Sequence, residues 1–257
     1  MKTPNKAVVN KRLLGQSRHD PFQFDSYLGF EGALSVATAT PLTFGKKMIS
    51  SDTFHKIKSD FGHYASWAVW AKQGDTPKSN VDDLTALNIQ KNPTLLESLR
   101  EDIIFLGLNI SRPIERPLGN FHDPRPMATD YKIRYALQDT HYWGGYMTDI
   151  IKDFEEKASG KMMKYLRSDP QFEKENIEIL RSEIDVLGHK DPILIAFGRD
   201  AEIIARRNLG NEYEICRIPH YANYTSKEKY RDQVLDILSR QKAEQGSGGN
   251  GYRRATL

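Results

Sequence analysis

The chain contains one long apolar run that turns polar at its end: Ile103-Ile104-Phe105-Leu106-Gly107-Leu108-Asn109-Ile110-Ser111. Such a run is typical of a strand buried on both faces of a parallel sheet. A second segment, Arg217-Ile218-Pro219-His220-Tyr221-Ala222-Asn223-Tyr224, also leads into polar residues. In open α/β sheets, ligands bind at the loops that follow the carboxyl ends of the strands. We therefore expect the amide of Asn109 and the imidazole of His220 to form a catalytic pair at one sheet edge.

Helix caps divide the C-terminal half of the chain into alternating helices and strands. Asp169-Pro170 predicts the start of a helix that Gly188 ends, because proline is favoured at the first helical position and glycine just after the last. Asn92-Pro93 predicts a shorter helix through Leu99, and Thr225-x-x-Glu228 predicts a capping box. Strands are predicted over 103–111, 145–151, 193–197 and 215–218. This alternation predicts an α/β fold whose central, mostly parallel sheet is flanked by helices on both faces.

The first third of the chain fits this alternation less well. Aromatic side chains from Phe54 to Trp70 predict a helix that packs its rings on the sheet. At the other end, Gly246-Ser247-Gly248-Gly249-Asn250-Gly251 is typical of a flexible segment. We therefore predict an N-terminal extension (1–85) that packs on the core, an α/β domain (86–242) and a flexible tail (243–257).

Composition narrows the class of protein. The 257 residues are 39% hydrophobic and 28% charged, which suits a sizeable buried core. No apolar run approaches the roughly 18 residues that cross a bilayer, and the N-terminus lacks a signal-type apolar segment, so we expect a cytoplasmic protein. The single cysteine, Cys216, excludes an internal disulfide, and the seven histidines lack the spacing of a zinc site. We expect a monomer that uses no metal and no cofactor.

Five segments place polar residues at strand ends or in the loops that follow: Gly107-Leu108-Asn109-Ile110-Ser111, Asn120-Phe121-His122-Asp123-Pro124-Arg125-Pro126, Thr148-Asp149-Ile150-Ile151-Lys152, Ala196-Phe197-Gly198-Arg199-Asp200-Ala201, and His220 after Arg217-Ile218-Pro219. In this order they resemble the motifs of the uracil-DNA glycosylase superfamily, particularly its thymine and mismatch-specific branch. That branch has Gly-Ile-Asn-Pro-Gly, Phe-x-His-Pro and His-Pro-Ser motifs, and related bacterial enzymes have a Thr-Asn-x-Val-Lys strand. The resemblance covers about residues 100–240 and implies a DNA glycosylase with the superfamily's α/β fold.

The chain departs from the superfamily pattern at both principal motifs. Ile110-Ser111 replaces Pro-Gly, and Tyr221-Ala222 replaces Pro-Ser after the histidine. The loop that would enter the minor groove is therefore expected to differ in shape. Ordinary uracil is consequently not assured as the substrate.

Hydrolysis of an N-glycosidic bond builds positive charge on the sugar and negative charge on the departing base. Asn109 would position the attacking water through its amide carbonyl, and His220 would stabilise the base anion as a hydrogen-bond donor. The alternative is structural, in which Asn109 caps a loop and His220 is a partly buried histidine. Their paired placement at two strand ends favours the catalytic interpretation.

Base recognition requires an extruded base held between an aromatic face and hydrogen bonds. Phe121 is the candidate for the face, with Gly107 and Leu108 beside it, and a hydrophobic loop anchor is the alternative role. In the related glycosylases, an Asn at the position of Asp149 reads uracil. An ionised carboxylate cannot donate to O4 and would accept from an exocyclic amino group, which favours a modified cytosine such as those of certain phage genomes. If Asp149 is protonated or points away, uracil is the expected base.

Polar and basic residues around the same loops would contact the DNA backbone. We predict such contacts from Ser111, Arg112, Arg116, Arg125, Arg199, Tyr221 and Asn223. The first 18 residues add five basic side chains and no acid, which suits either a phosphate backbone or a solvated tail. We expect four further residues near this edge as lining only: His122, His141, Tyr142 and Trp143.

Other classes of protein are alternatives. A nucleotide-binding regulator would use the same edge, but no Gly-x-Gly-x-x-Gly follows a strand and no Gly-x-x-x-x-Gly-Lys-Ser/Thr occurs. A serine hydrolase would require a Gly-x-Ser-x-Gly elbow, which is absent. A non-catalytic DNA-binding module of the glycosylase fold is the stronger alternative, because both motifs are altered. We expect an enzyme that removes a damaged or modified pyrimidine base from DNA, with uracil repair as the second enzymatic interpretation.

Overall fold

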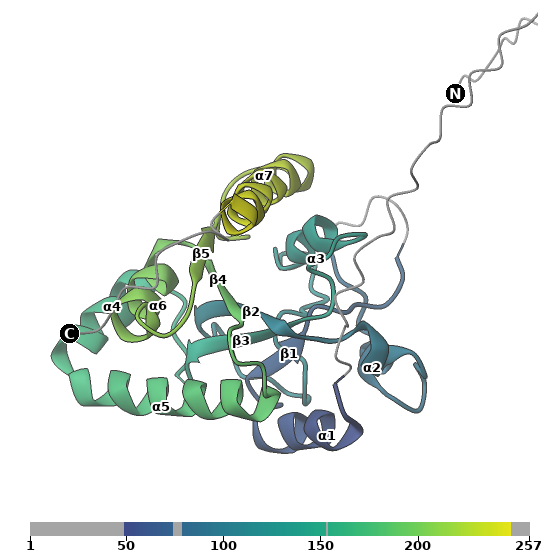
Figure 1. The fold of residues 1–257 in the computed structure, drawn as a ribbon, viewed down its shortest axis with the longest axis horizontal. Helices are drawn as coiled ribbons and strands as arrows, with labels where there is room; N and C mark the ends of the chain where they lie inside the picture. Colours follow the sequence, from purple (N-terminus) through teal and green to yellow (C-terminus); the bar gives the residue numbers. More distant parts are fainter. Residues whose placement is uncertain (1–48, 74–78, 153, 248–257) are drawn as a thin grey trace, which may run out of the picture. The chain divides into compact units, whose positions relative to one another are not determined.

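A five-stranded sheet forms the centre of the fold, with the strand order β1-β3-β2-β4-β5 (Figure 1). The computed structural model describes residues 49–73, 79–152 and 154–247. Four strands run parallel: β2 (Arg100–Asn109), β3 (Gly145–Ile151), β4 (Ile193–Phe197) and β5 (Ile215–Ile218). The edge strand β1 (Ala65–Trp67) pairs antiparallel with β3. The predicted α/β class with a mostly parallel sheet is confirmed.

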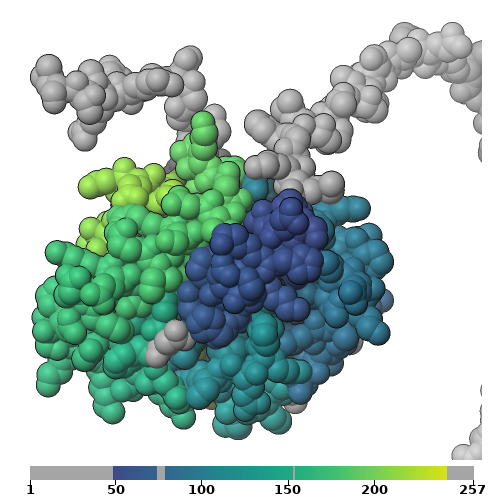
Figure 2. Space-filling model, turned by 90° about the horizontal axis from the view of Figure 1, so that it is seen from below, coloured from purple at the N-terminus to yellow at the C-terminus, as the bar shows by residue number. Residues whose placement is uncertain are grey.

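Helices cover both faces of this sheet (Figure 1). The helices of the described residues are α1 (Ser51–Asp60), the 3-10 helix η1 (Leu84–Leu87), α2 (Leu95–Ser98), α3 (Tyr131–Leu137), α4 (Ser159–Ser168), α5 (Pro170–Leu187), α6 (Arg199–Leu209) and α7 (Lys227–Ser247). Helices α1, α4, α5 and α6 pack on one face, and α3 and α7 pack on the other. Figure 2 shows α1, in dark blue, beside the green α5.

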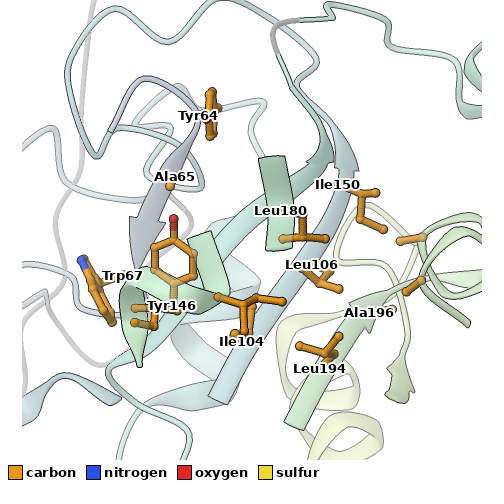
Figure 3. Close-up of a cluster of buried hydrophobic side chains, with 14 of the residues drawn as sticks. Tyr64, Ala65, Trp67, Ile104, Leu106, Tyr146, Ile150, Leu180, Leu194 and Ala196 are labelled. Atoms are coloured by element: carbon orange, nitrogen blue, oxygen red, sulfur yellow. The ribbon is translucent and has the colours of Figure 1, made fainter. Parts of the chain in front are cut away.

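Alternation along the strands explains the two layers, because successive side chains of a strand point to opposite faces. Ile104 and Leu106 of β2 join the cluster under α5, together with Trp67 and Tyr146 (Figure 3). Phe105, between them, faces α3 and α7 instead. Both faces of β2 are therefore buried, as the continuous apolar run predicted.

The parallel register brings the carboxyl ends of four strands to one edge. Gly107 of β2 lies beside Asp149 of β3, and Phe197 of β4 lies beside Ile218 of β5. Helix α6 starts directly after Gly198, at the end of β4. The loops after β2, β3, β4 and β5 therefore open at the same side of the sheet, where a ligand site is expected.

Several predicted boundaries are wrong. The segment predicted as one aromatic helix up to Trp70 is α1 followed by β1, a buried strand that forms by pairing with β3. The helix predicted from Asn92-Pro93 begins only at Leu95. The last helix is capped by Ser226, one residue after the predicted Thr225. The Ser226 hydroxyl accepts a hydrogen bond from the backbone N–H of Lys229.

The predicted N-terminal extension and C-terminal tail each include part of the described residues. The extension predicted over 1–85 includes α1 and β1, which belong to the unit spanning residues 45–257. The tail predicted from residue 243 includes the last turn of α7, which ends at Ser247. The basic stretch within residues 1–18 and the tail residues 248–257 lie outside the described residues. Across the described ranges, no helix is long and apolar enough to cross a membrane.

Candidate functional site

A cavity of about 540 Å³ opens at the carboxyl ends of the strands. The loops after β2, β3, β4 and β5 all contribute to its wall. Of the predicted site residues, it brings together Gly107, Leu108, Asn109, Ser111, Arg112, Phe121, Arg125, Asp149, Arg199, His220, Tyr221 and Asn223. Arg116 is not part of its lining. Residues separated by more than a hundred positions in sequence thus share one concave site.

The end of β2 fixes the orientation of the Asn109 amide. Its nitrogen Nδ2 donates to three backbone carbonyls, those of Ile110 (2.8 Å), Phe154 (3.1 Å) and Glu156 (2.8 Å). Three acceptors around one atom identify it as the NH₂ group, because a carbonyl oxygen cannot donate. Within the part of the chain that the structure describes, Oδ1 accepts no hydrogen bond. The amide therefore anchors the loop after β3, and its Oδ1 remains a free acceptor on a residue that lines the cavity.

The loop after β5 fixes the tautomer of His220. The backbone N–H of Ala222 donates to Nδ1 at 3.0 Å, so Nδ1 is unprotonated and the proton of the neutral ring resides on Nε2. Burial lowers the pKa of the imidazole from its ordinary value of 6.5, which keeps the ring neutral at pH 7. The ring stacks on Tyr221, with centroids 4.3 Å apart. Nε2–H is thus available as an uncharged donor.

Gly198 allows His220 to approach the end of β4. Its φ of +86° is a conformation that favours glycine, and a Cβ there would lie 3.2 Å from Cβ of His220. The Gly198 N–H donates to the carbonyl of Ile218 at 2.9 Å, which ties the two strand ends together. The glycine therefore helps to hold the imidazole at the cavity.

Phe121 and Asp149 meet above Gly107. A Cβ on Gly107 would overlap Oδ1 of Asp149 and would lie 3.2 Å from Cζ of Phe121. Phe121 has a φ of +62°, which is uncommon for a bulky residue. Trp70 holds this conformation through a 3.1 Å hydrogen bond from Nε1 to the Phe121 carbonyl. Only a residue without a side chain leaves room here for both groups.

Asn120, which sequence reasoning missed, joins these groups. Its Nδ2 donates to Oδ2 of Asp149 at 2.7 Å and to the carbonyl of Tyr64 at 2.8 Å. Its Oδ1 accepts from the backbone N–H of Phe121 at 3.1 Å. One buried amide thus positions both the carboxylate and the aromatic ring. A polar residue directly before Phe121-His122 was the one available signal in the sequence.

Asp149 is buried, and the pKa of its carboxyl group is strongly shifted. Loss of solvation raises the pKa of its carboxyl group to about 6, partly opposed by the hydrogen bond from Asn120 and by the charge of Lys152. Lys152 is itself buried, where it forms an ion pair with Glu183 and donates to Thr148 at 2.9 Å. The carboxyl group of Asp149 therefore changes charge near neutral pH, as groups at functional sites often do.

Three of the four arginines predicted to contact phosphates are paired with acids. Arg112 and Arg125 both bind Asp123, with N–O distances of 3.1 and 2.6 Å. Arg116 pairs with Asp82 away from the cavity. Arg199 lines the cavity and forms no ion pair with any described residue. The predicted arginine set is thus largely a loop-stabilising network in this structure.

The remaining predicted contacts have mixed environments. Ser111 is exposed at the cavity, and the carbonyl of Asn223 accepts from Lys132 at 3.0 Å. The ring of Tyr221 lies edge-on to Phe121 and Phe197. Burial and nearby carboxylates hold the pKa of its hydroxyl well above 10. Tyr221 is therefore a wall of the cavity as well as a candidate DNA contact.

Asp130 is a second residue that sequence reasoning missed. It lines the cavity and is buried, and its Oδ2 accepts from the backbone N–H of Asp123 at 2.7 Å. Its Oδ1 is buried without a partner among the described residues. Burial raises the pKa of this carboxyl group to about 7. It has no distinctive sequence signal.

Two of the predicted lining residues are elsewhere. His141 and Tyr142 line a separate cavity of about 200 Å³ with Ile103 and Ile193, at the amino ends of β2 and β4. His122 is buried beside Trp70, and desolvation lowers the pKa of its ring to about 3. The prediction that His141 and Tyr142 lie near this edge is wrong, because they lie at the other ends of the strands. His122 does not line the cavity, although it stands between Phe121 and Asp123, which do.

Likeness to known proteins does not assign a family. No protein-family model matches this chain, and no curated protein matches it significantly. The fold and cavity alone define an α/β protein with a cavity lined by polar residues at its strand ends. Within the described residues, no group of His, Cys, Asp and Glu side chains is arranged to hold a metal.

Proposed function

We propose that this protein is a DNA glycosylase that hydrolyses the N-glycosidic bond of a pyrimidine-type base. The observation that carries the proposal is the complementary placement of Asn109 and His220 in one cavity. Asn109 offers a fixed acceptor, and His220 offers a fixed neutral donor. The resemblance of five ordered segments to uracil-DNA glycosylase motifs supports the same reaction class.

The proposed reaction needs one water molecule and the two groups. Oδ1 of Asn109 accepts a hydrogen bond from a water that attacks C1′ of the sugar. As the C1′–N bond breaks, its electron pair goes to the base, and Nε2–H of His220 stabilises the resulting anion. The water oxygen stays on the sugar, and the proton that it loses neutralises the base through solvent. Neither residue has to change its own charge.

Asp149 and the cavity volume favour a modified cytosine as the base. An ionised Oδ1 over Gly107 would accept from an exocyclic amino group, which uracil lacks. The volume of about 540 Å³ lies within the range of about 300–1,000 Å³ that holds drug-sized ligands, so a substituent on the ring has room. Removal of such a base from phage DNA would serve defence against foreign DNA.

One specific observation supports uracil as the alternative base. The pKa of about 6 at Asp149 means that part of the protein carries a protonated carboxyl group below neutral pH. A protonated Oδ1–H would donate to a carbonyl oxygen such as O4. A non-catalytic DNA-binding module is the other alternative, given the altered motifs.

The test compares base release from DNA strands of one sequence. The strands carry uracil, cytosine, hydroxymethylcytosine or glycosylated hydroxymethylcytosine, and alkali cleavage reports abasic sites. We expect cleavage of a modified-cytosine strand by the wild-type protein, and a large loss with Asn109→Ala. Efficient release of uracil alone would assign the repair function. Absence of abasic sites with every base, while DNA binding persists, would support the binding module.

A further inference from the structure

A row of basic side chains begins at the cavity and continues along α4. Lys157 lines the cavity just before the helix, and Lys161, Lys164 and Arg167 follow at helical spacing. All four residues are exposed. We refer to these four side chains as the α4 row.

Burial determines the direction of the row. Met162 and Leu166 are buried, so the opposite side of α4 faces solvent. With about 100° between successive residues, Lys164 lies at the centre of that opposite side, and Lys161 and Arg167 lie about 60° to either side of it. The basic side chains of α4 are therefore directed outward, on a helix whose first residue, Ser159, lines the cavity.

The acids of this segment are largely engaged elsewhere. Glu156 accepts from the backbone N–H of Ala158 at 2.8 Å and approaches Lys161 only at 4.0 Å. Asp169 caps α5 by accepting from the backbone of Phe172 at 3.1 Å. Glu155 is exposed in the loop before α4. Among the described residues, Lys157, Lys164 and Arg167 form no ion pair.

Glu173, at the far end of the row, is neutralised by its own partners. Arg207 forms an ion pair with it, and Nδ2 of Asn208 donates to it at 2.8 Å. Next to this group, Arg167 and Lys174 line a hollow of about 230 Å³. The positive charge of the row is therefore not cancelled by this neighbouring carboxylate.

The dimensions of the row match a nucleic-acid strand. Lys161 and Arg167 are six residue steps apart, or about 9 Å at a rise of 1.5 Å per residue. One strand of a duplex carries a phosphate about every 3.4 Å along the axis, so the row spans two to three phosphates. In contrast, Arg112 and Arg125 share the carboxylate of Asp123.

We propose that the α4 row binds the DNA backbone beside the nucleotide that enters the cavity. This inference rests on the proposed glycosylase function. It makes the α4 row, in place of the arginine-rich loop, the main electrostatic contact with DNA. Lys157 would meet the phosphate nearest the cavity, and Lys164 and Arg167 would meet the following ones. Phosphate contacts of this kind fix position and register without reading sequence.

The test is the salt dependence of binding to an undamaged duplex of mixed sequence, measured by fluorescence anisotropy. The variant combines Lys164→Ala and Arg167→Ala, neither of which lines the cavity. Its control combines Lys91→Ala and Lys190→Ala, two exposed lysines outside the cavity with the same total loss of charge. With about 0.9 per phosphate contact, the slope of log K against log salt should fall by about 1.8 in the variant and stay unchanged in the control.

Base release distinguishes the inference from the proposed function. We expect the variant to raise KM several-fold and to leave kcat at saturating DNA unchanged. If wild-type protein releases a base but variant and control bind DNA equally, the α4 row is not the backbone contact and the glycosylase proposal stands. If wild-type protein neither binds DNA nor releases a base, both proposals are overturned.

Discussion

The side-chain amide of Asn120 donates a hydrogen bond of 2.7 Å to Oδ2 of Asp149. Because Oδ2 serves as an acceptor, a proton on this carboxyl group resides on Oδ1, the oxygen above Gly107. Ionised Asp149 therefore presents an acceptor at the cavity, and protonated Asp149 presents a donor. The protonation state of one buried group would determine which edge of a base is read.

This relationship predicts a pH-dependent base preference. Burial raises the pKa of Asp149 from 3.8 to about 6, so the acceptor form dominates above pH 6 and the donor form dominates below it. The ratio of kcat/KM for modified cytosine to kcat/KM for uracil should therefore rise between pH 5 and 7 and then level off. Measuring the ratio cancels the titration of His220, which affects both substrates. A ratio that is flat across this range would contradict the assignment.

Asp149→Asn provides the control for this profile. An Asn side chain can accept from Asn120 and present its NH₂ group to the cavity, so the ratio should fall and lose its pH dependence.

Asp149→Asn should also change the free energy of unfolding. The raised pKa means that the stabilisation of the protonated carboxyl group is present below about pH 4 and is lost as the pH rises through about 6. Asp149→Asn should thus raise the free energy of unfolding at pH 7 more than at pH 4, in urea titrations.

Asn109 and His220 should each carry a large part of catalysis. Asn109→Ala and His220→Ala should each raise the barrier of the chemical step by about 2.7 to 4 kcal/mol, the effect of one lost preorganised donor or its equivalent. Single-turnover measurements at saturating protein isolate this step. DNA binding should persist in both variants. Wild-type turnover in either variant would remove that residue from the mechanism.

Asn109→Ala also removes three hydrogen bonds to backbone carbonyls. The thermal stability of this variant must therefore be measured together with its activity, because loss of the hydrogen bonds that anchor the loop would also lower activity. Asn109→Asp separates the effects, since it retains an acceptor but replaces the donating NH₂ group with an oxygen. It should be the less stable of the two variants, because a carboxylate would face three carbonyl oxygens.

The sequence predicted the strands well because their apolar runs are local. The stretch from Ile103 and the strand from Ile193 are each bounded by turn signals, and the parallel sheet follows from the helices between such strands. β1 was missed because its three residues become a strand only by pairing with β3, more than 75 positions later. Strands this short depend on their partners rather than on their own pattern.

The sequence identified the cavity residues that lie at the ends of strands. It missed the residues whose place at the cavity depends on tertiary contacts. Asn109 and Asp149 could be placed from strand ends, whereas the link from Asn120 to Asp149, 29 positions later, exists only in the folded chain. The ion pairs of Arg112 and Arg125 with Asp123 could not be predicted either. The sequence shows that Asp123 is nearby in the chain, but not which way its side chain points. Sequence patterns therefore identified the edge of the sheet but not the pairing of charges around it.

Phe121 should prove to be both a base-stacking residue and a core residue. Its side chain is 5% exposed and packs on Phe197. Phe121→Ala should weaken binding to a substrate strand by about 1 to 3 kcal/mol and lower the unfolding free energy by about 3 to 5 kcal/mol. Phe105→Ala is the matched control, because that buried ring also contacts Phe197 but does not line the cavity. Equal substrate affinity in the two folded variants would assign Phe121 to the core alone.

Gly107 should be irreplaceable at the floor of the cavity, and Gly160 should be replaceable. A Cβ at Gly107 would overlap Oδ1 of Asp149 and press on Phe121, and such overpacking costs about 1 to 3 kcal/mol. Gly107→Ala should therefore lower the unfolding free energy by that amount and abolish base release, since both base-contacting groups must shift. A Cβ at Gly160 of α4 meets no atom within 4 Å, so Gly160→Ala should stabilise the helix by about 0.5 kcal/mol and leave base release intact. Urea titration and the abasic-site assay measure both effects, and an active Gly107→Ala protein would show that Asp149 and Phe121 need not approach each other for catalysis.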